Sequence, residues 1–219
     1  EADATQSDIK DSCEGVTQVS KNPQTIAEAI ALINSLPKPV TIPCYIKSLK
    51  RPLRINATAS ALSAQPASGR DNPRLFFFDG SLITTFALVG EGAKAIEFSF
   101  LVSASESVKG EISFPVTYDL ASNEAYEQIL IGSGIIGTRC SGCHMNERKF
   151  SPDQNDSAFV SRALKPFAQV NVPLEEVRKL RGDCEHEQAD SDRCLLLRAV
   201  FDNGDVIWQD FPSSMPTLF

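Results

Sequence analysis

The segment Leu75-Phe76-Phe77-Phe78-Asp79-Gly80-Ser81-Leu82-Ile83-Thr84-Thr85-Phe86-Ala87-Leu88-Val89 decides the first part of the fold. Two runs rich in aromatic, aliphatic and β-branched residues flank Asp79-Gly80, a dipeptide typical of tight hairpin turns. The sequence therefore predicts two antiparallel strands, Leu75–Asp79 and Ser81–Val89, joined by this turn.

Apolar residues alternate with other residues on both sides of the hairpin. The alternating sets are Val40, Ile42, Cys44 and Ile46; Leu53 and Ile55; Ile96, Phe98 and Phe100; and Ile112, Phe114 and Val116. A period of two is typical of half-buried strands. About six strands separated by polar turns, including a polar loop over 63–73, predict a small antiparallel β-sandwich between residues 40 and 117.

Helical patterns precede and follow these strands. Thr25-Ile26-Ala27-Glu28 is typical of a capping box, and Pro37 and Pro39 would end that helix. Further helices are expected over 123–131, from Val172 onward, and after a cap at Ser191. We therefore expect two domains: a β-sandwich with an N-terminal arm and short helix over 1–120, and a small all-α domain over 121–219.

The second half of the chain contains Cys140-Ser141-Gly142-Cys143-His144. Two thiols three positions apart can each add to a vinyl group of one porphyrin, and the next imidazole then binds the iron as an axial ligand. One such motif predicts one covalent haem c, attached through Cys140 and Cys143, with His144 as the proximal ligand.

Three other interpretations of this motif exist. They are a disulfide between the two cysteines, a redox dithiol, and a zinc site shared with Cys184 and Cys194. No alternating strand and helix pattern surrounds Cys140, as a thioredoxin-like dithiol would need. The gap between Cys184 and Cys194 also differs from the short spacing of zinc knuckles, so haem is favoured.

Few residues can bind the other face of the iron. The candidates besides His144 are Met145, Met215 and His186. Met145 follows His144 directly and lies on the same side of the ring. Met215 lies in an apolar stretch, whereas His186 lies in an acidic run typical of a solvated loop. We expect Met215 as the sixth ligand, with His186 or an open site as alternatives.

Together, Cys140-Ser141-Gly142-Cys143-His144 and Met215-Pro216 resemble the mono-haem, Met/His-ligated cytochromes c. The resemblance covers residues 121–219 and implies an all-α haem fold with a Met-Pro loop on the iron. Members usually have a helix after that loop, whereas here the expected helix at 191–201 precedes it. Arg139, near a propionate, and Trp208, as a wall or donor, are candidate haem-pocket residues. Residues 1–120 resemble no family that we identify.

Composition and charge narrow the partners. Hydrophobic residues make up 42% and charged residues 22% of the chain, which is ordinary for a soluble globular protein. The net charge of −7 argues against nucleic acid and favours a redox partner with a basic docking face. The apolar runs, such as Leu75–Phe78, are too short to form a transmembrane segment.

The remaining cysteines indicate an oxidising compartment. Cys13, Cys44, Cys184 and Cys194 form an even set that allows three pairings. We favour Cys13–Cys44 and Cys184–Cys194, because each pair lies in one expected domain; free buried thiols are the alternative. Haem is attached on the periplasmic side, so we expect a mature periplasmic or extracellular chain after removal of a signal peptide.

These features predict a soluble electron carrier, more readily than an enzyme, because two histidines are too few for a typical catalytic set. One alternative is a haem protein with an open sixth site that binds a small gas or peroxide. Another is a β-sandwich binding module, for example for a glycan, with an accessory haem domain. Its aromatic residues would be Phe76, Phe77, Phe78, Phe98 and Phe100, although core packing is the favoured interpretation of these rings.

Overall fold

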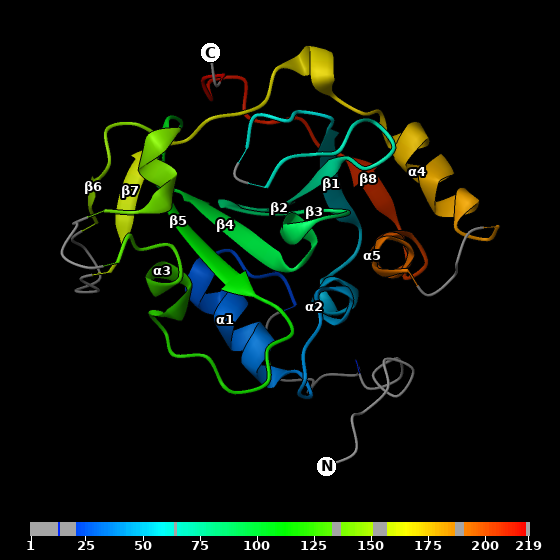
Figure 1. Cartoon of the computed structure of the whole chain (residues 1–219), viewed down its shortest axis with the longest axis horizontal. Helices are drawn as coiled ribbons and strands as arrows, with labels where there is room; N and C mark the ends of the chain where they lie inside the picture. Colours follow the sequence, from blue (N-terminus) through cyan, green and yellow to red (C-terminus); the bar gives the residue numbers. More distant parts are fainter. Residues whose placement is uncertain are drawn as a thin grey trace.

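The predicted hairpin lies in the middle of one eight-stranded sheet with the order β6-β7-β5-β4-β3-β2-β1-β8 (Figure 1). This arrangement comes from a computed structural model that describes residues 13, 21–63, 65–132, 137–150, 157–186 and 191–217. In the pairing of β2 with β3, Arg74 lies opposite Ala87 at one end and Asp79 lies opposite Leu82 at the turn. Gly80 takes a φ of +58°, which a glycine adopts without steric cost, so the Asp79-Gly80 turn is confirmed.

Five consecutive antiparallel strands build most of the sheet. They are β1 (Leu53–Thr58), β2 (Arg74–Asp79), β3 (Leu82–Ala87), β4 (Ala95–Leu101) and β5 (Glu106–Ser113). Two short strands, β6 (Arg148–Lys149) and β7 (Phe159–Arg162), extend the β5 edge. On the other edge β8 (Val206–Trp208) pairs in parallel with β1.

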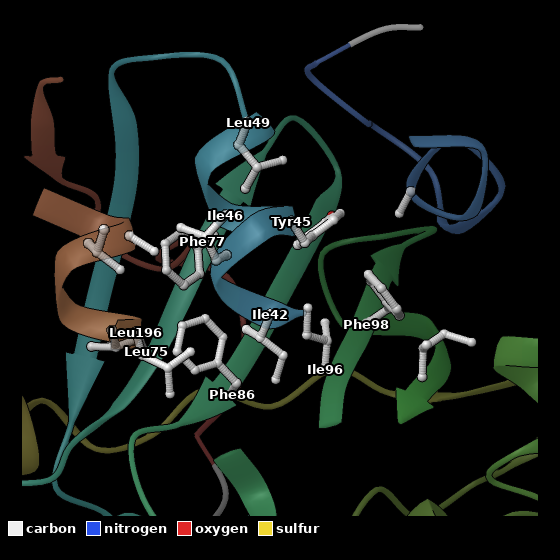
Figure 2. Packing of buried hydrophobic residues seen from close by; sticks show 14 of the residues in the cluster. Ile42, Tyr45, Ile46, Leu49, Leu75, Phe77, Phe86, Ile96, Phe98 and Leu196 are labelled. Carbon is white, nitrogen blue, oxygen red and sulfur yellow. The ribbon is translucent and has the colours of Figure 1, made fainter. Parts of the chain in front are cut away.

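Helices cover one face of this sheet, here called the helix face, which carries Leu75, Phe77, Phe86 and Phe98. Figure 2 shows Ile42, Tyr45 and Ile46 of α2 (Ile42–Ser48) and its C-cap Leu49 among the same buried side chains, together with Leu196. The other helices are α1 (Ile26–Ser35), α3 (Glu124–Glu127), α4 (Leu174–Asp183) and α5 (Asp192–Phe201). Three short 3-10 turns complete the elements: η1 (Glu91–Ala93), η2 (Arg139–Gly142) and η3 (Ala168–Val170).

Several helix boundaries and both disulfides agree with the sequence analysis. The Thr25 hydroxyl accepts a hydrogen bond from the Glu28 N–H at 3.2 Å, and Ser191 accepts one from the Cys194 N–H at 3.3 Å. Cys13 is bonded to Cys44 and Cys184 to Cys194. The helix after Pro173, the caps and the favoured disulfide pairing are therefore confirmed.

The strand predicted over Val40–Ile46 is wrong. Thr41 accepts a hydrogen bond from the Cys44 N–H at 3.3 Å, and a proline in the first turn helps to begin helix α2 at Ile42. Only Val40 keeps an extended contact, as an isolated bridge to Val116. The long helix predicted over 123–131 is reduced to the single turn of α3.

The predicted division into a β-sandwich and an all-α haem domain is also wrong. Residues after 121 supply β6, β7 and β8 to the same sheet, and α5 packs on α2. These three strands are two to four residues long, too short to show a period of two in sequence. Helices cover the face that a second sheet would cover in a sandwich. No helix in the described part of the chain is long and apolar enough to cross a bilayer.

Candidate functional site

The sheet face opposite the helices carries charged and hydroxyl side chains and is here called the polar face. On β4 and β5 they alternate with core residues and are Glu97, Ser99, Ser107, Lys109 and Glu111. Their neighbours Ile96, Phe98, Val108 and Ile112 belong to the core on the helix face. A single period of two thus places one polar set on one side of the sheet.

The Cys140–His144 motif forms a tight turn close to β6 and β7. Thr138 caps η2 by accepting a hydrogen bond from the Cys140 N–H at 3.2 Å. The carboxylate of Glu147 in turn accepts from the Thr138 N–H at 2.7 Å. The N–H groups of Cys143 and His144 both donate to the Cys140 carbonyl, at 3.2 and 2.9 Å. These bonds fix the two thiols and the imidazole on one turn of backbone.

The imidazole of His144 is oriented by the end of β7. Its Nδ1 lies 2.8 Å from the Arg162 carbonyl oxygen, and the Arg162 N–H donates back to the His144 carbonyl at 3.2 Å. An Nδ1–H that donates to a carbonyl leaves Nε2 as the nitrogen with a free lone pair. Burial, reinforced by the charge of Lys109, lowers the pKa of His144 to about 4, so the ring is neutral at pH 7.

The two motif cysteines carry free thiols, with Cys140 half-buried and Cys143 exposed. Burial and the negative charge of Glu97 raise the pKa of the Cys140 thiol to about 11. This shift disfavours Cys140 as the attacking thiol of a redox dithiol, because the thiolate is the nucleophile. Cys140 and Cys143 are not joined to each other in a disulfide in this structure.

The zinc interpretation also loses its ligands. Cys184 and Cys194 are joined in a disulfide, so their sulfurs are not free to bind a metal with Cys140 and Cys143. Within the described ranges, no group of three or more His, Cys, Asp or Glu side chains is arranged to hold a metal ion by itself.

Two ion pairs lie on the polar face beside the motif. Arg74 on β2 is bound to Glu97 at 2.5 Å, and Arg139 of η2 is bound to Glu111 at 2.9 Å. Arg139 also donates to the Gln128 carbonyl at 2.6 Å. The predicted pocket residue Arg139 is therefore next to the motif and fastened to the sheet.

The apolar part of the same face contains Met215. Met215 is buried in a cluster with Phe78, Ile83 and Ala163, against which Phe76, Leu101 and Phe211 pack. The Lys165 ammonium donates to two carbonyls of the loop before Met215, those of Pro212 at 3.0 Å and Ser213 at 3.1 Å. Because Ala163 follows Arg162 in the chain, Met215 and His144 are both anchored at the same end of β7.

The structure does not bring His186 and Trp208 to this site. His186 is exposed in the turn after α4, and α4 contacts β1 and α5. Trp208 is on β8, the edge opposite to β6 and β7, and its ring nitrogen donates to Asp210 at 2.7 Å. Phe77 and Phe98, for which core packing is favoured over glycan binding, are buried in the core under the helices, which confirms the favoured interpretation for these two rings.

Sequence reasoning missed Lys109, Ser161 and the Arg162 carbonyl. Ser107, Lys109 and Glu111 alternate with apolar neighbours. This alternation indicates that the strand predicted from Ile112 begins six residues earlier, at Glu106. The role of the Arg162 carbonyl has no signal in the sequence, since every residue has a backbone carbonyl.

A scan against protein-family models finds no match, and searches of curated proteins and of solved structures find none either. Functional inference therefore depends on the motif and its surroundings in this fold.

Proposed function

We propose that this chain is a mono-haem c-type electron carrier in which one haem is bound covalently through Cys140 and Cys143. The observation that carries the proposal is the environment of His144, whose Nδ1 faces the Arg162 carbonyl at 2.8 Å, so that Nε2 carries the lone pair. Iron-binding histidines characteristically donate their other ring nitrogen to such an acceptor. A neutral ring at pH 7 is also the form that binds metal.

The cysteines have the arrangement that attachment needs. Each thiol would add its S–H across one vinyl double bond, forming an S–C bond and placing the hydrogen on the other vinyl carbon, so no oxidant is required. Both thiols are free, and the turn from Thr138 holds them three positions apart. The haem would supply a one-electron iron couple, while the chain supplies the ligand, the apolar contact and the exclusion of water.

Met215 is the proposed sixth ligand. It is a buried thioether on the polar face, in a loop that Lys165 fastens and in a cluster that includes Ala163. Such a ligand stabilises the reduced iron and suits electron transfer. Its position beside the end of β7, where His144 is also anchored, supports it over His186, which is exposed after α4 near the other edge of the sheet.

The proposed setting is periplasmic or extracellular. The two disulfides indicate an oxidising compartment, which covalent haem attachment shares. With a net charge of −7, we propose a redox partner that docks through a basic face.

The test compares ligand variants of the protein produced together with a haem-attachment system. H144Q is expected to lose the low-spin spectrum of the iron, whereas the matched variant H186Q keeps it. M215L is expected to remove the weak far-red band of Met-ligated ferric haem. Equal spectra for H144Q and H186Q would contradict His144 as the ligand.

Carbon monoxide separates the carrier from the open-site alternative. Reduced wild-type protein should bind the gas slowly and weakly because Met215 must first leave, and M215L should bind it rapidly. Rapid, tight binding by the wild type would favour the alternative, a haem protein for small gases or peroxide.

A further inference from the structure

Lys109 is a buried cation with no carboxylate partner among the residues that the structure describes. Its relative exposure is 7%, and its ammonium donates to the hydroxyls of Ser99, at 3.2 Å, and Ser107. No salt bridge to Lys109 occurs within the described part of the chain, and Glu97, which acts on it electrostatically, is bound to Arg74. A buried charge is costly unless an opposite charge compensates it. Lys109 is therefore a buried positive charge on the polar face that no carboxylate of the described residues pairs with.

A third hydroxyl, that of Ser161, lies on the same side of the sheet and has no hydrogen-bond partner among the described residues. Ser161 is 1% exposed, and its Oγ makes no hydrogen bond. Ser107 pairs with Ser161 across β5 and β7, and Lys109 pairs with Ser99 across β5 and β4. Residues directly opposite each other in antiparallel strands point to the same side. One ammonium and three hydroxyls thus share one patch, which we call the Lys109 patch (Lys109, Ser99, Ser107 and Ser161).

We propose that the Lys109 patch is a binding site for a carboxylate, which under the proposed function is a propionate of the haem. A single ammonium matches a singly charged anion, and hydroxyl donors complete the hydrogen bonds of its oxygens. The patch lies near the motif, because Ser161 directly precedes Arg162, whose carbonyl oxygen lies 2.8 Å from Nδ1 of His144. The apolar cluster around Met215 lies on the same face, so carboxylate and ring would contact chemically matched regions.

The carboxylate site can be tested without haem. Protein produced without haem attachment is melted in sodium acetate, in sodium phosphate and in sodium chloride of equal ionic strength. Acetate is expected to raise the Tm of wild type above its value in chloride, and to do the same for K94M, which removes an exposed lysine. It should not do so for K109M. Equal acetate effects in all three, or a larger effect of phosphate than of acetate, would overturn the proposal.

S161A provides a second variant that keeps the lysine, in case K109M fails to fold. It removes the unpartnered hydroxyl and is expected to reduce the acetate effect on Tm, whereas an unchanged effect would count against the patch.

The haem assignment, which rests on the proposed function, is tested on the loaded protein. K109M should shift the propionate bending band in the resonance Raman spectrum and lower the reduction potential, because a positive charge near the iron is lost. K94M should change neither. If covalent haem is present but K109M and K94M behave alike, the propionate assignment is wrong and the proposed function stands. If haem is absent while acetate acts through Lys109, the proposed function fails and the carboxylate site stands.

Discussion

His144 is the residue whose environment carries the functional proposal, and it should also make the stability of the haem-free protein depend on pH. Its pKa falls from 6.5 to about 4 on folding because burial disfavours the charged ring. Between these values the unfolded chain binds a proton that the folded protein does not, so the free energy of unfolding falls as the pH is lowered. The loss from pH 6.5 to 4 is about 3 kcal/mol.

Urea denaturation from pH 6.5 to 4 checks the prediction. The pH dependence of the free energy of unfolding is measured for wild type and for H144Q, and the two are compared. The difference is needed because Asp79, whose pKa burial raises to about 6, acts with the opposite sign between pH 6 and 3.8. H186Q should keep the wild-type dependence. A pH dependence that H144Q leaves intact would show that the ring is not buried as described.

Lys109 predicts a second pH window at the alkaline side. Burial lowers its pKa from 10.5 to about 8, so the folded protein releases a proton that the unfolded chain keeps, and stability rises with pH between 8 and 10.5. K109M should abolish this rise and stabilise the haem-free protein at pH 7 by up to about 3 kcal/mol. K94M serves as the exposed control in chemical denaturation at pH 7 and 10. A K109M protein less stable than wild type at pH 7 would contradict an uncompensated charge.

At the scale of elements, α3 packs on β5, and both elements are linked to the motif turn through Arg139. A Cβ on Gly110 would lie 3.1 Å from the Cβ and 3.2 Å from the carbonyl oxygen of Ala125, so this strand position needs glycine for α3 to dock. Arg139 also donates to the Glu111 carboxylate on β5 and to the Gln128 carbonyl just after α3. A larger residue at Gly110 would therefore disturb both packing and the motif.

G110V is expected to lower the free energy of unfolding by about 1–3 kcal/mol, the usual cost of overpacking. The matched control is G182A in α4, where an added Cβ meets nothing within 4 Å and helix propensity favours alanine. Chemical denaturation of both variants checks this, and equal stabilities would show that α3 is not docked on Gly110.

Prediction from sequence succeeded where a local pattern is compatible with only one secondary structure. The Asp79-Gly80 hairpin, the Thr25 and Ser191 caps and the helix after Pro173 depend on neighbouring residues alone. It failed over Val40–Ile46, where alternating apolar residues also suit a short helix that contacts the core on several sides. For the site, the motif was evident in sequence. Its partners at β5 and β7 were not, because distant strand pairing brings them together.

At the scale of the whole molecule, both halves of the sequence build one sheet. Strand β1 is paired with β8, and α2 packs on α5 next to the shared core. Residues 1–120 alone would expose the β1 edge and the apolar surface that Leu196 and Leu197 cover.

The whole chain should therefore unfold in one cooperative transition, whereas a fragment of residues 1–120 should lack one. Thermal circular dichroism of both proteins checks this. A fragment that melts cooperatively near the temperature of the whole chain would contradict a shared core.

The central claim, covalent haem on the Cys140–His144 turn, is tested most directly by the alkaline pyridine spectrum of denatured, reduced protein produced with a haem-attachment system. Wild type should give the bands of a haem with both vinyl groups saturated, in an amount of one per chain. The double variant C140A/C143A should retain no haem after denaturation. A wild-type chain without such bands, or a double variant that keeps them, would contradict the account.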